Sequence, residues 1–287
     1  VFDEAYVDPD VLQKVRDALA RIDTDVIQAA GQLHTQLTKR KWSLFPTMLT
    51  TERPDRVAFN LSHGKIAFIL QGTPFVLIVP SVFYDFISAM DDFYQSFWVN
   101  RAMVLIRYMG LLVSLTLASF YVAVTSYNPE LLRVQLALSI AGSRAPVPYP
   151  SYIEVLFMLV MMEMLTEASV RLPKSIGSTA TTVGGLILGQ AATQAGLISN
   201  IMIIIVAAVA ISNFVIPIAA MSYGMRMVKY LLLFVTTLFG LMGLMAGLIA
   251  LVSYLASLES FGQPYLKVFM ESRKSASAAS KGEGEAA

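Results

Sequence analysis

Two acidic residues and one basic residue interrupt an otherwise apolar stretch near the middle of the chain. Glu163 and Glu167 lie four positions apart, so a helix over residues 151–170 would place both on one face, and Arg171 follows where it can pair with Glu167. Carboxylates at membrane depth are expensive and usually face water, protein or a partner charge. The three residues are therefore a candidate charge cluster, either a structural Glu167–Arg171 pair near the headgroups or, at Glu163, part of an ion or proton path.

An acidic residue at the start of the same segment has a simpler interpretation. Ser151 and Glu154 have the spacing of a capping box, in which two side chains satisfy free N–H groups of a helix's first turn. We favour this interpretation of Glu154 over a functional one.

The following apolar segment, residues 178–196, is rich in small and polar side chains. At helical spacing one stripe carries Thr179, Val183, Leu186, Gln190 and Gln194. Gly185 and Gly189 lie on a neighbouring stripe, in the Gly-x-x-x-Gly pattern of close helix packing. Glutamine amides in a membrane need another helix or water as a partner. The segment is therefore a candidate pore lining or a tightly packed bundle helix, and composition alone favours the second.

The chain has few residues suited to enzymatic catalysis, metal binding or nucleic-acid recognition. The 287 residues contain no cysteine and two histidines, His34 and His63, which excludes thiolate metal sites and leaves little for a zinc site or a Ser-His-Asp triad. Asp91 and Asp92 alone are more typical of a solvated turn than of a metal site. The formal net charge of +1 gives no argument for a nucleic-acid partner. We expect no catalytic residue, metal or cofactor.

The distribution of charge divides the chain. Hydrophobic residues make up 56% and charged residues 14%, against about 25% charged in soluble domains. More than half of the charged residues lie in the first 102 positions. We therefore expect a soluble α/β module over residues 1–100, truncated at its start, a transmembrane helical domain over 101–258, and a polar, largely disordered tail over 259–287.

The first region reads as a mixed α/β module. Residues 8–38 predict two amphipathic helices, the first starting at Asp8-Pro9 and the second carrying Ile22, Val26 and Ile27 and ending near Gly31. Val57, Phe59 and Leu61 alternate as in a strand. Residues 65–70 and 74–80 predict two further strands around a turn at Gly72.

The membrane region predicts four or five spans. The candidate segments are 103–126, 151–170, 178–196, 199–222 with a break at Asn213 and Pro217, and 228–258, and the helix over 129–143 is expected at the interface. Gly240, Gly243 and Gly247 in the last segment indicate helix packing. If 151–170 is a span, Arg226 and Lys229 lie on the cytoplasmic side and the tail lies outside. In a four-span topology the tail lies on the cytoplasmic side and Arg226 and Lys229 do not. The expected fold class is an α-helical polytopic membrane protein with an N-terminal α/β cytosolic module.

Several short sequence motifs, found one after another between residues 50 and 266, resemble those of the GerA family of spore germination proteins. They are Thr51 to Asp55, Gly72 to Pro80, Tyr121 to Thr125 with Asn128-Pro129-Glu130, Pro146 to Pro150, Glu167-Ala168 with Val170 to Pro173, Gly189 to Ala192 with Ala195-Gly196, and Ser260 to Gly262 with Pro264 to Leu266.

The resemblance implies the A subunit of a nutrient germinant receptor, in the inner membrane of bacterial endospores. It implies membrane lipid, a B-type transporter-like subunit and a C-type lipoprotein as partners. It also implies a homo-oligomeric ring that conducts ions when a nutrient is sensed. In that setting the stripe from Thr179 to Gln194 is the expected pore lining.

Other functions are compatible with the same residues. A transporter-like subunit would use Glu163 as a coupling group and the break at Pro217 as a substrate site. A non-conducting scaffold would recruit partners through residues 1–100, for example as an accessory of the dipicolinate-release channel with which a close relative of the family is associated.

Overall fold

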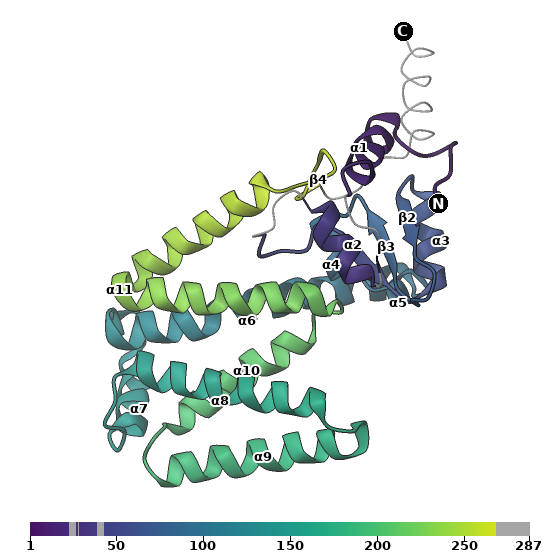
Figure 1. The fold of residues 1–287 in the computed structure, drawn as a ribbon. Coiled ribbons are helices and arrows are strands. Elements are labelled where there is room, and N and C mark those ends of the chain that lie inside the picture. The colour runs from purple at the N-terminus through teal and green to yellow at the C-terminus, as the bar shows by residue number, and fades with distance from the viewer. Residues whose placement is uncertain (23–26, 28, 39–42, 268–287) are drawn as a thin grey trace. The chain divides into compact units, whose positions relative to one another are not determined.

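The computed structural model describes residues 1–22, 27, 29–38 and 43–267, and for residues 174–176 and 178–181 it describes the backbone alone. The chain forms two compact units (Figure 1). Unit 1 comprises Val1–Leu105, Pro217–Gly224 and the described residues from Leu251 on; unit 2 comprises Ile106–Ile216 and Met225–Ala250.

Unit 1 contains a three-stranded antiparallel sheet. Strands β1 (Leu49–Thr51), β2 (Ile66–Ile69) and β3 (Val76–Val79) are arranged in the order β1-β3-β2. The central strand is apolar along its length because it is covered on both faces, and Leu77 and Ile78 are fully buried. The turn between β2 and β3 passes through Gly72 at φ 88°, a conformation that glycine adopts without strain. The expected pair of strands around Gly72 is confirmed.

Helices α1 (Pro9–Leu19) and α2 (Ala30–Leu37) share an apolar core with this sheet. The Asp8 side chain accepts a hydrogen bond from the Asp10 N–H at 3.0 Å and Pro9 occupies the first turn, so the expected helix start is confirmed. The second helix differs from its prediction. It begins at Ala30, so Gly31 lies in its first turn and does not end it, whereas Val26 lies outside the described residues.

The predicted strand at Val57, Phe59 and Leu61 is wrong. These residues lie in helix α3 (Pro54–Ser62), followed in the chain by α4 (Phe83–Ile87) and α5 (Met90–Phe93) after the second and third strands. Pro54 and Asp55 in the first turn favour a helix start, and this local signal prevails over the short alternation.

Unit 1 ends in a short hairpin of β4 (Glu259–Ser260) and β5 (Gln263–Pro264). The Ser260 hydroxyl donates to the carbonyl of Thr47 at 2.6 Å, and the buried Tyr265 hydroxyl donates to the carbonyl of Pro46 at 2.9 Å. Residues 259–267, which the sequence assigned to the tail, are therefore ordered. The rest of the expected disordered tail, 268–287, lies outside the described residues.

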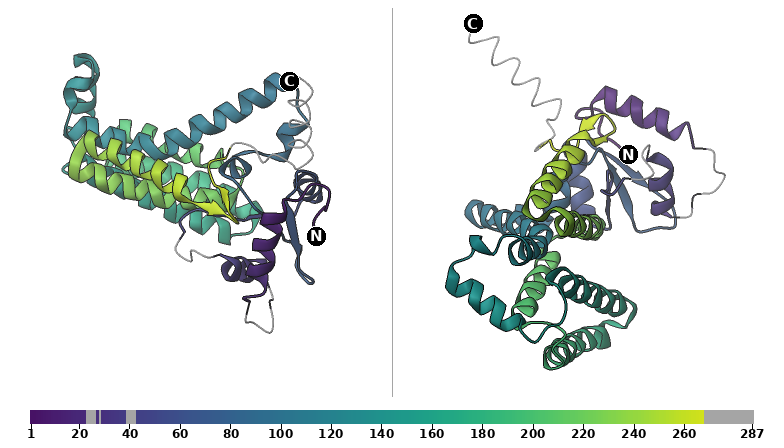
Figure 2. Two further views of the ribbon diagram at one scale, coloured as in Figure 1. Left: turned by 90° about the horizontal axis from the view of Figure 1, so that it is seen from above. Right: turned by 90° about the vertical axis from the view of Figure 1, so that its left-hand side faces the viewer.

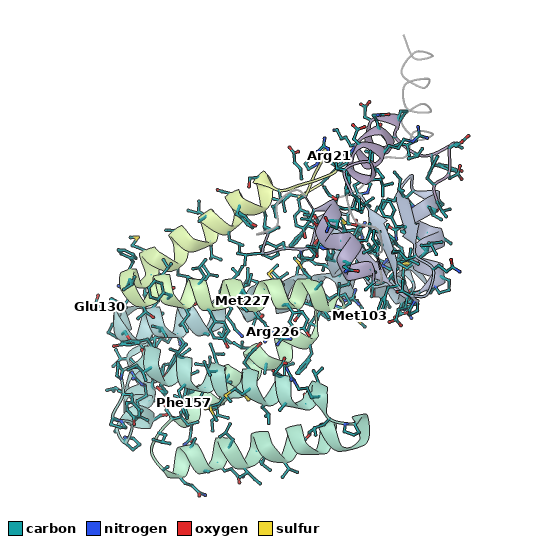
Figure 3. All side chains as sticks on the ribbon, viewed as in Figure 1. Arg21, Met103, Glu130, Phe157, Arg226 and Met227 are labelled. Carbon is teal, nitrogen blue, oxygen red and sulfur yellow. The ribbon has the colours of Figure 1, made fainter. Side chains whose placement is uncertain are left out.

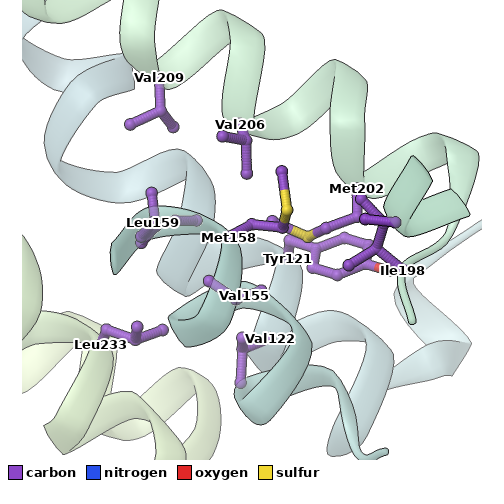
Figure 4. Packing of buried hydrophobic residues seen from close by; sticks show 12 residues of the cluster. Tyr121, Val122, Val155, Met158, Leu159, Ile198, Met202, Val206, Val209 and Leu233 are labelled. Atoms are coloured by element: carbon purple, nitrogen blue, oxygen red, sulfur yellow. The ribbon is translucent and has the colours of Figure 1, made fainter. Parts of the chain in front are cut away.

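Unit 2 is helical, and its elements pack around one apolar cluster (Figures 2 and 4). Its elements are the part of α6 (Phe97–Ser126) from Ile106 on, the 3₁₀ turn η1 (Pro129–Leu131), α7 (Val134–Arg144), α8 (Ser151–Arg171), α9 (Lys174–Gln194), α10 (Asn200–Phe214) and the Met225–Ala250 part of α11 (Ala219–Ser257). Val122 of α6, Val155 of α8, Met202 of α10 and Leu233 of α11 meet in this cluster.

Among the described residues, two helices are long and apolar enough to cross a bilayer. They are α6, with a mean hydropathy of 1.8 in its most apolar window, and α11, with 2.2; α10 is apolar but shorter. The expected four or five spans are not confirmed on this measure. The segment 199–222, expected as one kinked span, is instead divided, because α10 ends at Phe214 before Pro217 and α11 begins at Ala219.

Helix α11 reverses direction at Gly240, which has φ 61° and ψ −141° (Figure 1). The expected single span over 228–258 is therefore two limbs, Ala219–Phe239 and Leu241–Ser257. A Cβ on Gly243 would lie 2.5 Å from the Val235 carbonyl oxygen, and one on Gly247 would lie 2.6 Å from Leu232 Cδ2. The limbs thus approach closely where the glycines lie, and the first limb alone, at 1.5 Å per residue, is about 31 Å long, close to the thickness of a bilayer core.

Candidate functional site

The side of α9 that carries the polar stripe is not covered by the described part of unit 2. Val183 is 48% exposed and Leu186 60% exposed, and Gln190 and Gln194 are exposed as well. These four residues fall within an arc of about 80° on the helix. The side chain of Thr179 lies outside the described residues. The four described members of the predicted stripe therefore share one face that is open to water, to lipid or to another protein.

The opposite side of α9 packs on two helices of its own unit. Gly184 and Gly185 lie against the Leu165 side chain of α8, where an added Cβ would be 3.2 and 3.4 Å from its methyl carbons. A Cβ added to the buried Gly189 would lie 3.9 Å from Ile203 Cδ1 of α10, and Ala192 belongs to the apolar cluster. In Figure 1, α9 lies at the edge of the unit. Its small residues allow close contact on one side, which leaves the stripe on the other.

Glu163 forms an ion pair with a helix that is distant in sequence. Its Oε1 accepts a hydrogen bond from Arg226 Nη1 of α11 at 2.6 Å, and both side chains are partly exposed (Arg226 is labelled in Figure 3). Lys229, one turn further along α11, is only 1% exposed, and its ammonium lies 5.0 Å from the ring centroid of Tyr230. The Tyr230 hydroxyl in turn donates to the Leu159 carbonyl of α8 at 3.3 Å. A carboxylate, two cations and an aromatic ring therefore join α8 to α11.

The other two members of the predicted charge cluster pair with each other. Arg171 Nη2 lies 2.8 Å from Glu167 Oε1, and both side chains are more than half exposed. This is the pair that their spacing on α8 predicted, whereas the spacing suggested no partner for Glu163. Exposed pairs of this kind contribute about 0.3–0.5 kcal/mol to a helix.

The capping-box interpretation of Glu154 is wrong. Its side chain is fully buried, and its Oε1 accepts hydrogen bonds from the Ser199 N–H and hydroxyl, each at 2.7 Å. Its Oε2 accepts from Arg144 Nε at 3.1 Å. Pro150 precedes the first turn of α8, so Ser151 lies inside the helix and is not its cap. Glu154 therefore links α8 to the end of α7 and the start of α10.

The break between α10 and α11 also has a polar contact. The Ser114 hydroxyl of α6 donates to the Asn213 side-chain oxygen near the end of α10. This contact satisfies an amide at the point where the helix ends, and it explains why an asparagine is tolerated in so apolar a segment.

Sequence reasoning missed the roles of Arg226, Lys229, Arg144 and Ser199. Arg226 and Lys229 were used only to assign topology, although two cations three positions apart in a long apolar helix are themselves a signal of a buried partner. In unit 1, the partners of Arg53 were also missed: it pairs with Asp55 and Asp91, each at 2.9 Å. The part of the chain that the structure describes contains no group of three or more residues suited to a metal ion.

The comparisons with known proteins agree on one family. Residues 1–280 match the family model described as Bacillus/Clostridium GerA spore germination protein. Spore germination protein KA of Bacillus subtilis (strain 168) is 40% identical over 263 residues, which are 92% of this chain and 48% of that protein. The uncharacterized membrane protein YfkQ of the same strain is 39% identical over 263 residues, 92% of this chain and 51% of that protein.

A relative from another species shows the same coverage. Spore germination protein GerLA of Bacillus cereus is 37% identical over 265 residues, 92% of this chain and 54% of that protein. The chain therefore spans about half the length of the curated relatives that it matches. No solved structure matches it.

Proposed function

Because this chain belongs to the GerA family of spore germination proteins, we propose that it acts as the membrane subunit, of the A type, of a nutrient germinant receptor. Several copies would assemble into a ring in the inner membrane of the endospore. The ring would conduct ions when a nutrient is sensed, and this flux would start germination. The proposal includes a B-type transporter-like subunit and a C-type lipoprotein as partners.

The exposed face of α9 is the observation that carries this proposal. A helix that faced lipid on this side would place the amides of Gln190 and Gln194 in hydrocarbon, where unsatisfied polar groups are costly. A helix that faced a water-filled path would satisfy both amides, while Val183 and Leu186 on the same stripe would narrow the path. Apolar constrictions of this kind can gate a pore by excluding water.

The ion pair between Glu163 and Arg226 supports a second element of the proposal. It joins α8, on which α9 packs, to the first limb of α11. A change in this pair would therefore be felt at α9 through Leu165. We infer that the cluster of Glu163, Arg226 and Lys229 holds the closed arrangement of the helices.

The test is ion flux through reconstituted protein. The full chain would be placed in liposomes together with its receptor partners, and flux would be measured after addition of the nutrient. Replacing Val183 by Phe should abolish flux while the oligomeric mass in nanodiscs is unchanged. The control is Val170→Phe, because Val170 is also exposed on a helix but lies on α8, outside the stripe.

The outcomes separate the alternatives. Flux that is unchanged in Val183→Phe would remove α9 from the path. A monomeric mass, with saturable uptake of a labelled nutrient that Glu163→Gln abolishes, would favour a transporter-like subunit. A protein that neither conducts nor transports, yet is needed to retain its partners, would favour a scaffold.

A further inference from the structure

The first two turns of helix α6 carry two large aromatic side chains that face outward. Trp98 is 81% exposed and Phe97 64% exposed, and the apolar run that begins at Met103 follows directly. Arg101 lies in the same two turns and is exposed as well. Large apolar side chains that gather on a surface mark a place where another molecule binds. We call Phe97, Trp98 and Arg101 the aromatic cluster of α6.

The three side chains of this cluster contact one another. The rings of Phe97 and Trp98 are 5.6 Å apart between centroids and nearly perpendicular, at 80°. The Arg101 guanidinium carbon lies 5.2 Å from the centroid of Phe97, close enough for a cation–π interaction. Arg101 forms no ion pair with any residue that the structure describes. The cluster therefore presents two aromatic rings and one uncompensated positive charge to its surroundings.

The helix beyond the cluster is exposed on most of its circumference. Val99, Met103, Leu105, Ile106 and Met109 are all at least 40% exposed. At 100° per residue, these five residues and the two aromatic rings spread over an arc of about 240°. A single partner helix covers a stripe of roughly 100°. So wide an apolar arc is better matched by a fluid apolar medium, a lipid bilayer, than by one protein partner.

The length of α6 places the cluster at the edge of such a bilayer. Its 30 residues are about 45 Å long, whereas the hydrocarbon core is about 30 Å thick. About ten residues must therefore lie outside the core. Tryptophan is enriched at membrane–water interfaces, and arginine reaches lipid phosphates from there. The composition of the first two turns matches this interface, and that of the run from Met103 on matches the core.

We propose that the aromatic cluster binds the headgroup region of the phospholipid bilayer and sets the depth of α6. The two rings would lie level with the ester groups of the lipids, and Arg101 would bind a lipid phosphate. This inference rests on the membrane location in the proposed function but not on the ion path. It also predicts the depth of Met109, which lies on the same side of α6 as Trp98 and eleven positions further along. Met109 would be about 16 Å deeper, near the middle of the core.

Fluorescence quenching by brominated phospholipids measures this depth in the full chain in nanodiscs. The chain contains two tryptophans, so Trp42→Phe leaves Trp98 as the only one. Lipid brominated near the ester end of its acyl chains should quench Trp98 more strongly than lipid brominated near the methyl end. The matched probe is Met109→Trp with both natural tryptophans replaced by Phe, and its order of quenching should be reversed. If Trp42→Phe does not fold, the difference between the parent chain and Trp98→Phe gives the same measurement.

The outcomes distinguish this proposal from the membrane location on which it rests. If neither lipid quenches the Met109→Trp probe, α6 is not embedded and both proposals fail. If the deep lipid quenches that probe but Trp98 is unquenched, water or a second protein chain covers the cluster, and the lipid contact is wrong. Stronger quenching of Trp98 by the deep lipid would place the cluster in the core and would also reject it.

A second comparison tests whether the cluster sets the depth. Replacing Phe97 and Trp98 together by Ala, in the chain that carries the Met109→Trp probe, should shift the ratio of shallow to deep quenching. The control replaces Leu105 and Leu112 by Ala, because both are 60% exposed on the same helix but would lie within the core. The control should leave the ratio unchanged. An unchanged ratio after loss of the aromatic pair would overturn the assigned role.

Discussion

Arg226 on α11 donates a hydrogen bond to the carboxylate of Glu163 on α8 at 2.6 Å, although the two residues are 63 positions apart in the sequence. The buried Lys229 lies one turn away on the same helix. One carboxylate thus faces two cations within the helical unit. The packing of α8 on α11 therefore depends on charge as well as on apolar contacts.

Replacing Glu163 by Gln should destabilise unit 2 by about 1.5–3 kcal/mol, because it removes the charge from the hydrogen bond with Arg226 and the negative charge that faces Lys229. The free energy of unfolding in mixed micelles would measure this loss. Glu167→Gln is the matched control, since its pair with Arg171 is exposed, and it should change stability by less than about 1 kcal/mol. Equal effects of the two changes would contradict the assigned importance of the Glu163–Arg226 pair.

Replacing Glu154 by Leu should be more severe, at about 3–5 kcal/mol, because it removes the buried carboxylate that pairs with the partly buried Arg144. It also removes the acceptor of the Ser199 N–H and hydroxyl at the start of α10. A double-mutant cycle with Arg144→Met would show whether the two residues are coupled. Additive effects would mean that the hydrogen bond between them contributes nothing to stability.

Gly240→Ala should destabilise the reversal of α11 by at least about 1–2 kcal/mol, because a side chain is strained at a positive φ. Its Cβ would also lie 2.9 Å from Tyr127 Cγ. Gly142→Ala is the control. Gly142 lies inside α7 with nothing within 4 Å, so alanine there should stabilise the helix by about 0.5–1 kcal/mol. The two thermal midpoints should therefore move in opposite directions.

The stability of unit 1 should fall as the pH falls through about 6.5, the ordinary pKa of histidine. Burial lowers the pKa of His34 in the folded chain, so the unfolded chain binds more protons in the window between the two pKa values. The contribution of His34 is therefore fully present above that window and is lost as the pH falls through it. His34→Gln should reduce this slope in thermal unfolding measured between pH 5 and pH 8, and an unchanged slope would assign it to other groups.

Local signals in the sequence predicted part of the fold correctly. Asp8 and Pro9 mark the start of α1, Gly72 marks the turn between β2 and β3, and the apolar run beginning at Met103 lies within α6. Each of these features depends on neighbours within a few positions. The strand predicted at Val57 failed because a three-residue alternation is a weaker signal than a proline and an aspartate at a helix start.

The stripe predicted on α9 depends partly on the local sequence and partly on tertiary packing. The helical period alone places Val183, Leu186, Gln190 and Gln194 on one side, and the structure leaves that side uncovered within the described part of unit 2. The close approach of Leu165 and Ile203 to the glycines of α9 determines which side of this helix packs on α8 and α10. Whether the open side meets water is the subject of the proposed flux experiment.

What the sequence determined by itself is the class of the molecule: a largely apolar chain with a charged first third, long apolar segments and the motifs of one family. Only the tertiary structure decided the partners of its charges. Glu154 meets Ser199 and Glu163 meets Arg226 because a carboxylate in an apolar interior must find a donor wherever the fold brings one, at any distance along the chain. Likewise, Gly240 permits either a continuous helix or a reversal, and the packing of its two limbs selects the reversal.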